Sequence, residues 1–421
     1  MAIENMHSTP MANRFVLGLF GRRNVGKSSL INALTGQNLA IASEIAGTTT
    51  DPVYKAMELL PIGPIVFIDT AGLDDEGELG RLRVEKTYEV LRKCDFALVV
   101  TEADSGITEF ERDFVEQLLR RKIPCLCVVN QCDKRMPRND ELELMKKKVN
   151  IPLAFVSTRD GWGIDELKNR IIATAERRDT EPPLVGDLIR PGEVAVLVTP
   201  IDSAAPKGRL ILPQQQTIRD IIENDAIAIV TKEHELKRTL EAMRLPPAVV
   251  ITDSQAFLQV AAETPPAIPL TSFSILFARQ KGDLAEMARG IRRIERLAPG
   301  ERVLIVEGCT HHRQSDDIGT VKIPRWIRRM AGENIEFEWA SGACFPRHLE
   351  KFDIIVHCGG CMLNRREMLY RMEIAREHGV AMTNYGMLIA HAVGILPRAL
   401  KPFPEAYLAL TESYSEKRRI S

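Results

Sequence analysis

The chain has 421 residues, more than a single hydrophobic core usually serves, so we expect two or three domains. Its 56 Lys and Arg against 57 Asp and Glu give a net charge of -1, without the basic surplus that nucleic-acid binding needs, so nucleic acid is not expected as a main partner. The absence of a run of about 18 apolar residues or of an apolar signal segment predicts a cytoplasmic protein without membrane contact, and its eight cysteines should remain thiols.

Residues 1–13 are predicted to be a flexible terminus, and residues 14–178 a first α/β domain. Short apolar runs alternate there with helical patterns, which is typical of a mainly parallel sheet with helices on both faces. The predicted strands are Phe15–Phe20, Ile65–Ile68, Phe96–Val100, Cys125–Val129 and Leu153–Val156. Residues 179–190 are predicted to be a linker, because paired prolines cannot continue a helix.

Two further α/β domains are predicted, at residues 191–265 and 266–421, separated near a proline cluster. In the first we expect strands at Val194–Thr199, Arg209–Leu212, Ala226–Val230 and Val249–Thr252, with helices at Gln215–Glu223, Glu233–Met243 and Ser254–Ala262. In the second we expect strands at Arg302–Val306 and Asp353–Val356, with helices at Asp283–Leu297, Pro324–Met330 and Arg365–Glu377.

A phosphate-binding loop follows the first predicted strand and opens a helix. Its pattern, G-x4-G-K-S, runs through Gly21, Arg22, Arg23, Asn24, Val25, Gly26, Lys27 and Ser28, and Ser29 follows in the helix. The glycines let backbone N–H groups curl around a β-phosphate, at which the helix N-terminus also points. Lys27 is expected to reach the β- and γ-phosphates, and Ser28 to bind Mg²⁺. A degenerate loop that binds nucleotide without turnover is the alternative.

Three more motifs appear in the order that a guanine-nucleotide site requires. Asp69-Thr70-Ala-Gly72 follows a strand, where Asp69 can hold Mg²⁺ through water and the Gly72 N–H can sense a γ-phosphate. Asn130-Gln131-Cys-Asp133 follows the predicted strand Cys125–Val129. An ionised Asp133 accepts from the two N–H groups of guanine that adenine lacks. Ser157 and Thr158 are expected to support the base from the other side.

Soft metal ligands follow two later strands. Cys309-Thr-His311 comes after the strand ending at Val306, and His357-Cys358-Gly-Gly-Cys361 after the strand ending at Val356. Sites in open α/β sheets gather at this strand edge, and clustered thiolates repel one another unless a cation joins them. Three Cys and one His suit both zinc and an iron–sulfur cluster. His357 is either a ligand or a hydrogen-bond partner.

The nucleotide motifs resemble those of the translation-factor-like GTPases, and Gly47-Thr48-Thr49-Thr-Asp51 resembles the switch I segment of their tRNA-modification and ribosome-assembly branch. The resemblance implies that Thr48 and Thr49 reach the nucleotide, with Thr49 contributing to Mg²⁺ in the GTP state. Asn24 matches the asparagine that helps to hold K⁺ in potassium-activated members. Gln131 replaces the usual Lys, which should loosen nucleotide binding. Leu73 stands where other switches carry a water-orienting Gln, so hydrolysis should be slow and should need K⁺. Lys27, Asn24, Thr49 and Asp69 are the expected catalytic residues.

Both motif sets together resemble the FeFe-hydrogenase maturation GTPases, the HydF family. The resemblance implies a dimerisation domain at 191–265 and a 4Fe-4S cluster on Cys309, Cys358 and Cys361 in the domain at 266–421. The fourth iron position would be exchangeable or held by His311 or His357.

The same resemblance implies function: a GTP-hydrolysing scaffold, a homodimer or higher oligomer, that receives a di-iron precursor with two radical-SAM maturases and delivers it to apo FeFe-hydrogenase. The alternative function is a regulatory GTPase with a structural zinc site in RNA or ribosome assembly.

Overall fold

The computed structural model describes residues 10–36, 53–70, 78–176, 182–200, 210–308, 317–342, 345–346 and 348–411. The chain divides into two compact units, residues 1–180 and 181–421, and each is considered by itself. Among the described residues, no helix combines the length and apolar character needed to cross a membrane.

Unit 1 is built on a six-stranded sheet with the order β2-β3-β1-β4-β5-β6. Its strands are β1 (Phe15–Phe20), β2 (Val53–Leu59), β3 (Gly63–Asp69), β4 (Phe96–Glu102), β5 (Cys125–Asn130) and β6 (Leu153–Phe155). All neighbours are parallel except β2, which runs antiparallel to β3 at the sheet edge. Strands β1 and β5 are buried along their whole length, as expected of a parallel sheet covered on both faces.

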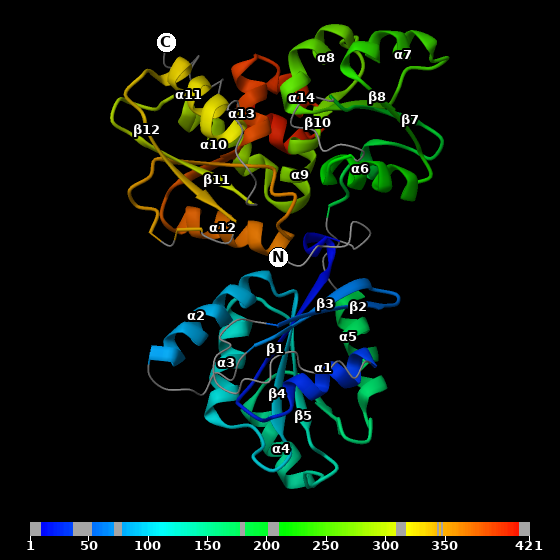
Figure 1. Ribbon diagram of the computed structural model, residues 1–421, viewed down its shortest axis with the longest axis vertical. Helices are drawn as coiled ribbons and strands as arrows, with labels where there is room; N and C mark the ends of the chain where they lie inside the picture. Colours follow the sequence, from blue (N-terminus) through cyan, green and yellow to red (C-terminus); the bar gives the residue numbers. More distant parts are fainter. Residues whose placement is uncertain are drawn as a thin grey trace. The chain divides into compact units, whose positions relative to one another are not determined.

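Helices cover both faces of this sheet (Figure 1). They are α1 (Lys27–Thr35), α2 (Glu78–Lys93), α3 (Glu109–Arg120), α4 (Asn139–Lys148) and α5 (Ile164–Glu176), with a short 3-10 turn at Met11–Asn13. Helices α1 and α5 bury apolar side chains against one face, and α2, α3 and α4 against the other. The carboxyl ends of β1, β3 and β5 therefore carry the loops in which the nucleotide motifs lie.

Unit 2 contains two parallel four-stranded sheets. The first has the order β10-β9-β7-β8, from β7 (Val194–Val198), β8 (Ile227–Thr231), β9 (Val249–Thr252) and β10 (Leu270–Ser272). Its helices are α6 (Leu212–Glu223), α7 (Leu236–Ala242), α8 (Phe257–Glu263) and α9 (Phe273–Lys281), with 3-10 turns at Gly186–Leu188, Glu233–Glu235 and Ser254–Ala256.

The second sheet of unit 2 has the order β12-β11-β13-β14. Its strands are β11 (Arg302–Glu307), β12 (Glu336–Ser341), β13 (Ile354–His357) and β14 (Ala381–Asn384). Its helices are α10 (Leu284–Ile294), α11 (Ile323–Ala331), α12 (Arg365–Glu377), α13 (Tyr385–Ala392) and α14 (Leu396–Leu400), with a π-helical turn at Ile318–Lys322. One hydrophobic core includes buried side chains from both sheets and from α9 and α13, so the two layers form one body.

The α/β class and the parallel sheets are confirmed, and one predicted strand is wrong. Of the expected strand Arg209–Leu212, Leu210 and Ile211 are irregular and Leu212 begins α6. Pro213 lies in the first turn of that helix, where its missing N–H costs nothing, and Gln214 accepts a hydrogen bond from the Ile211 N–H. The apolar run is thus a helix start.

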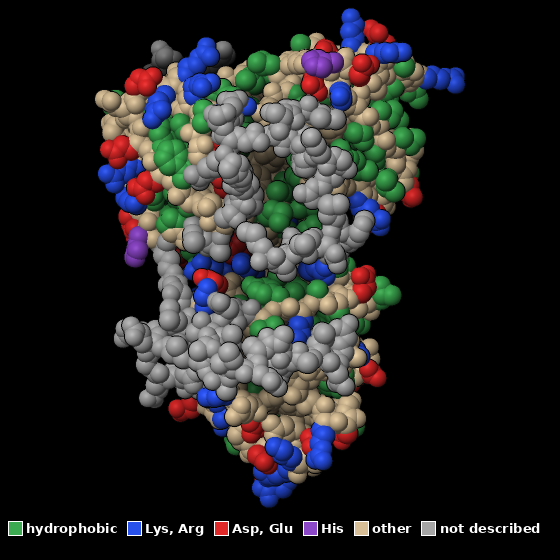
Figure 2. All heavy atoms as spheres, in the orientation of Figure 1, with side chains coloured by type: hydrophobic (Ala, Val, Ile, Leu, Met, Phe, Trp, Pro, Cys, Tyr) green, Lys and Arg blue, Asp and Glu red, His purple; other side chains and the backbone are tan. Residues whose placement is uncertain are grey.

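Strand β8 is the edge of the first sheet of unit 2 and exposes apolar side chains. Ile227 is 51% and Val230 43% exposed, and Ile222 on the neighbouring α6 is 57% exposed. Figure 2 shows hydrophobic side chains gathered on this side of the unit. An open strand edge with exposed apolar side chains is a surface on which another chain can pair.

Candidate functional site

The loop between β1 and α1 is wound tightly, and its glycines are required by that path. Gly21 has φ 150°, and a Cβ there would lie 2.3 Å from the Val100 carbonyl oxygen. Gly26 has φ 90°, and a Cβ there would lie 2.4 Å from Asn130 Nδ2. Lys27 Nζ donates to the carbonyl oxygens of Gly21 and Arg22, at 2.9 and 2.8 Å. The ammonium group is therefore held inside the loop, where a phosphate could take over its bonds.

The two expected Mg²⁺ residues lie side by side. Ser28 Oγ donates to Asp69 Oδ2 at 2.6 Å, across from α1 to the end of β3. Burial raises the pKa of the Asp69 carboxyl, while the Ser28 hydrogen bond and the charges of Lys27 and Lys55 lower it. A divalent cation between these groups would stabilise the ionised carboxylate. Thr70, next along the chain, is buried and donates from Oγ1 to the Leu19 carbonyl at 2.6 Å.

The guanine motif is joined to the phosphate loop by Asn130. Its Nδ2 donates to the Val25 carbonyl at 3.1 Å, and its Oδ1 accepts from the Thr158 N–H at 3.3 Å. Asp133 Oδ1 accepts from Ser157 Oγ at 3.0 Å, which joins the guanine motif to the segment after β6. The sequence-predicted residues of three separate loops are thus brought together.

Two residues of this site adopt left-handed backbone conformations: Asn24 has φ 64° and Gln131 has φ 65°. Gln131 Nε2 donates to the Asn24 carbonyl at 3.3 Å, so the residue that replaces the family's usual Lys still touches the phosphate loop. Arg23 and Asn24 are exposed in the loop, and Ser29 is exposed on α1. Thr48, Thr49 and Gly72 lie outside the described residues.

Sequence reasoning missed the partner of the Arg22 side chain. Arg22 was expected to contribute to the phosphate loop, yet its guanidinium contacts Glu111 on α3 and Ser105 in the loop before that helix. The only sequence signal was the capping pattern Thr108-x-x-Glu111, which predicts a helix start and not a contact with a distant loop.

Gly308, after β11, meets the Cys358 segment that follows β13. The Cys358 N–H donates to the Val306 carbonyl at 2.8 Å, and Cys358 Sγ accepts from the N–H groups of Gly308 and Gly360, at 3.1 and 3.4 Å. Hydrogen bonds to sulfur favour its thiolate form, which is the form that binds metals. Gly308 directly precedes Cys309 in the chain.

The second thiol of this segment, Cys361, is partly buried. Burial raises the pKa of the Cys361 thiol, and the charge of Lys281 opposes that rise. Lys281 is itself buried and donates from Nζ to the Leu363 carbonyl at 2.6 Å, so a fixed positive charge lies near this segment. A soft cation would stabilise the thiolate that burial otherwise disfavours.

His357 is held by the protein through both ring nitrogens. Nδ1 lies 2.8 Å from the Cys358 carbonyl oxygen, and Nε2 lies 3.0 Å from Nη1 of Arg371. Because Arg371 only donates, Nε2 accepts and Nδ1 carries the proton. Burial and the charge of Arg371 lower the pKa of His357 to about 3. This geometry favours the second sequence interpretation, in which His357 is a hydrogen-bond partner.

Arg371 and Glu367, also missed from the sequence, complete this arrangement. Arg371 Nε donates to Glu367 Oε1 at 3.0 Å, with both side chains buried on α12. Within the described residues no group of three or more His, Cys, Asp or Glu side chains is arranged to hold a metal ion; Cys309 and His311 lie outside them.

Comparisons with known families match the three parts of the chain separately. Residues 16–131 match the 50S ribosome-binding GTPase model, residues 184–282 the hydrogen maturase F dimerization domain, and residues 285–402 the hydrogen maturase F tetramerization domain. The two hydrogen maturase F matches together cover more than half of the chain.

Curated GTPases and a solved GTPase structure match parts of the chain. The tRNA modification GTPase MnmE of Heliobacterium modesticaldum is 40% identical over 154 residues, which are 36% of this chain and 32% of that protein. GTPase Der of Wolinella succinogenes is 32% identical over 182 residues, 41% of this chain and 38% of that protein. The matched stretch spans about a third to a half of the length of the curated relatives. The crystal structure of Era from Aquifex aeolicus, bound to GDP and aluminium fluoride, aligns with a TM-score of 0.34 and 20% identity, over 55% of this chain and 98% of Era.

The nucleotide motifs of unit 1 lie in a domain of the GTPase family, and both sheets of unit 2 lie in matches to one maturase. The chain belongs to the hydrogen maturase F (HydF) family, with a GTPase domain similar to those of MnmE and Der.

Proposed function

We propose that this protein is a GTP-hydrolysing scaffold that holds a 4Fe-4S cluster and delivers a di-iron precursor to apo FeFe-hydrogenase. The observation that carries the proposal is the hydrogen bond from the Gly308 N–H to Cys358 Sγ, inside the tetramerization-domain match. It brings the segment that continues into Cys309 to the segment that carries Cys358 and Cys361.

For GTP hydrolysis, the residues support a division of roles. Lys27 would exchange its carbonyl partners for phosphate oxygens, and Ser28 and Asp69 would hold the Mg²⁺ that neutralises phosphate charge. Asp133 selects guanine, while Asn130 keeps its loop fixed to the phosphate loop. Catalysis of this kind depends on positioning and charge, so the loop-to-loop contacts are its structural requirement.

We further propose that Asn24 helps to bind K⁺ and that K⁺ speeds hydrolysis. Its amide side chain is exposed within the phosphate loop, and its φ of 64° is one that Asn and Gly adopt readily. The matched variant is therefore Asn24→Gly, which keeps the backbone and removes the amide. We expect the wild-type rate to be higher in KCl than in NaCl, and the variant to lose that difference. An unchanged K⁺ response in the variant would exclude Asn24 as a ligand.

The types of donor in unit 2 would suit a cluster. Three thiolates, Cys309, Cys358 and Cys361, would hold three irons, and the N–H groups of Gly308 and Gly360 already point at one of the sulfurs. When bound, the cluster would supply an exchangeable fourth iron position to which a di-iron fragment can attach. The Cys358 segment is held through the His357 ring, which contacts the Cys358 carbonyl and Arg371, and Arg371 is in turn held by Glu367.

For its partners, we propose a homodimer or higher oligomer that meets two radical-SAM maturases and the apo-hydrogenase. The dimerization and tetramerization matches support self-association, and the apolar β8 edge lies within the first of them. Thr49 and Gly72 are the proposed γ-phosphate sensors through which GTP would change these contacts.

Anaerobic reconstitution with iron and sulfide tests the proposal. We expect close to four irons and four sulfides per chain, a visible charge-transfer band, and GTP turnover by the same preparation. About one zinc per chain without a visible band would instead support the structural zinc site of the alternative function. The Cys358→Ser variant should lose the cluster, and the substitution Lys401→Ser, of an exposed residue, is the matched control.

A further inference from the structure

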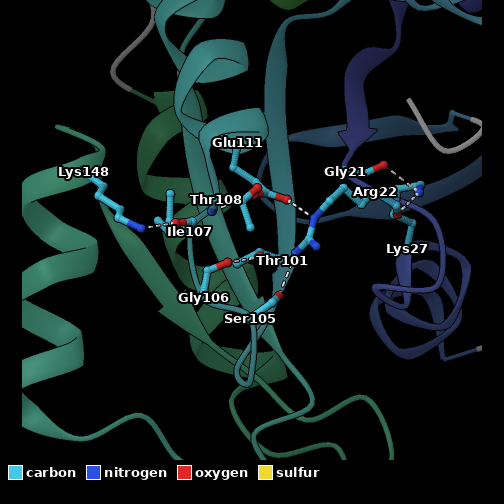
Figure 3. Close-up of polar contacts among 10 residues, drawn as sticks. All are labelled: Gly21, Arg22, Lys27, Thr101, Ser105, Gly106, Ile107, Thr108, Glu111 and Lys148. Carbon is cyan, nitrogen blue, oxygen red and sulfur yellow. Dashed lines mark hydrogen bonds and ion pairs between the residues drawn. The ribbon is translucent and has the colours of Figure 1, made fainter. Parts of the chain in front are cut away.

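Glu111 is a fully buried carboxylate in the first turn of α3, and it serves two separate parts of unit 1 (Figure 3). Its Oε2 accepts from the Thr108 N–H at 2.9 Å and from the Thr108 hydroxyl, which forms the helix cap. Its Oε1 accepts from Nε of Arg22 at 2.8 Å, a residue 89 positions earlier in the phosphate loop. Helix capping alone would leave Oε1 without that charged partner.

The α3 side of this contact is fixed from several directions (Figure 3). Thr101 Oγ1, at the end of β4, donates to the Gly106 carbonyl at 2.6 Å. Lys148 Nζ, at the end of α4, donates to the Ile107 carbonyl at 2.6 Å. Ile107 is itself buried in the core beneath α3. The loop that leads into α3 therefore presents Glu111 in one position.

The Arg22 side of the contact is the phosphate loop itself. Nη2 of Arg22 donates to Ser105 Oγ at 2.6 Å, so the guanidinium is held by two residues around the start of α3. The carbonyl oxygen of the same Arg22 accepts from Lys27 Nζ. One residue thus connects the buried carboxylate to the lysine that is expected to bind phosphate.

Both the charges and the planar geometry of the guanidinium restrict the motion of the Arg22–Glu111 pair. A buried carboxylate needs a cation and hydrogen-bond donors, and the planar guanidinium fork gives up little conformational freedom for each bond it makes. If the phosphate loop already has its binding conformation in the free protein, little conformational entropy is lost when nucleotide binds, and the affinity is higher.

We propose that the Arg22–Glu111 pair is a positioning device that holds the phosphate loop ready for nucleotide, fixing it to the start of α3. This inference rests on the proposed guanine-nucleotide site. It adds Glu111, a residue outside every nucleotide motif, to the groups that set the affinity of the protein for nucleotide. Since the anchored loop is the one expected to enclose the β-phosphate, which GDP and GTP share, the affinities for both nucleotides should depend on it alike. Glu111 acts through Arg22 and touches no nucleotide.

The test is a double-mutant cycle on nucleotide affinity, with Arg22→Ala, Glu111→Gln and the double variant in the full chain. The Glu111→Gln side chain keeps an acceptor for the Thr108 cap and loses the charge. Glu109→Gln, an exposed acid in the same helical turn, is the matched control. Dissociation constants for GDP and for a non-hydrolysable GTP analogue are measured by calorimetry, together with KM, kcat and the thermal midpoint.

We expect each single variant to weaken both nucleotides about tenfold, the double variant to be little worse than either, and Glu109→Gln to match wild type. The KM for GTP should rise together with the dissociation constants, while kcat stays close to the wild-type value. Additive effects of the two substitutions, or a lowered thermal midpoint with unchanged GDP affinity, would overturn the proposal and leave Glu111 a helix cap. If Glu111→Gln does not fold, Arg22→Ala still tests the proposal through its nucleotide affinity, because it changes a side chain that is partly exposed. Wild-type protein that binds no guanine nucleotide would refute the proposed function instead.

Discussion

At the scale of single residues, His357 shows how a neighbour decides what a side chain can do. A histidine beside a Cys-x-x-Cys segment suggests a metal ligand, yet a buried arginine occupies the lone pair that a metal would need. The same contact and the burial of the ring keep His357 neutral at physiological pH. Its hydrogen bond to the Cys358 carbonyl fixes the backbone from which a proposed ligand projects.

The variant His357→Gln tests this role. We expect reconstituted protein to keep its iron and sulfide content and the EPR g values of its reduced form, because no ligand is removed. Thermal stability should fall by about 1–3 kcal/mol, since Arg371 loses a buried acceptor. The comparison is Cys361→Ser, which should lose cluster content. Changed g values in His357→Gln, at full iron content, would mean that the imidazole does bind iron.

At the scale of helices and strands, the sequence predicted best what a local pattern determines. Strand β1 and helix α12 match their predicted bounds because an apolar run or a capped amphipathic stretch defines each. Four strands were missed: β2, β10, β12 and β14. Strand β12 is an edge strand with alternating charged residues, and β14 has only four residues and owes its place to pairing with β13.

The candidate sites divide in the same way. The motif residues of the phosphate loop, the Mg²⁺ pair and the guanine motif could be named from spacing, and the described ones lie together at one sheet edge. Glu111, Arg371 and Glu367 could not, because each matters through a contact made across the fold, and a single sequence carries no sign of such contacts.

Packing of α10 on β14 allows a test at this scale. Gly290 lies inside α10, and a Cβ there would come within 2.1 Å of the Met382 carbonyl oxygen on β14. Alanine favours a helix over glycine by about 1 kcal/mol, but the close backbone contact should outweigh that gain. We expect Gly290→Ala to destabilise unit 2 by about 1–3 kcal/mol.

The measurement is hydrogen exchange of the α10 and β14 peptides in wild type and in Gly290→Ala. Arg289→Ala, the substitution of an exposed residue one position earlier in the same helix, is the control and should change exchange little. Slower exchange in Gly290→Ala than in wild type would show that helix propensity prevails over the contact with Met382.

At the scale of the whole molecule, the two proposed chemistries lie in different compact units. The phosphate loop and its partners belong to residues 1–180, and the cysteine segments to residues 181–421. Each site is built from hydrogen bonds and core contacts within its own unit. A nucleotide can influence the second unit only through contacts that differ between two conformations, so the sites should be coupled in function but independent in assembly.

Reciprocal variants test that independence. Lys27→Ala removes the ammonium group that bonds to the Gly21 and Arg22 carbonyls and is expected to reach phosphate, so GTP hydrolysis should fall below detection. Its iron and sulfide content should equal that of wild type, because the hydrogen bonds that hold the Cys358 segment come from residues of unit 2. Cys358→Ser should do the reverse, losing the cluster while hydrolysing GTP at the wild-type rate. Loss of iron from a folded Lys27→Ala protein would show that cluster assembly depends on an intact nucleotide site, and the two sites would then not be independent.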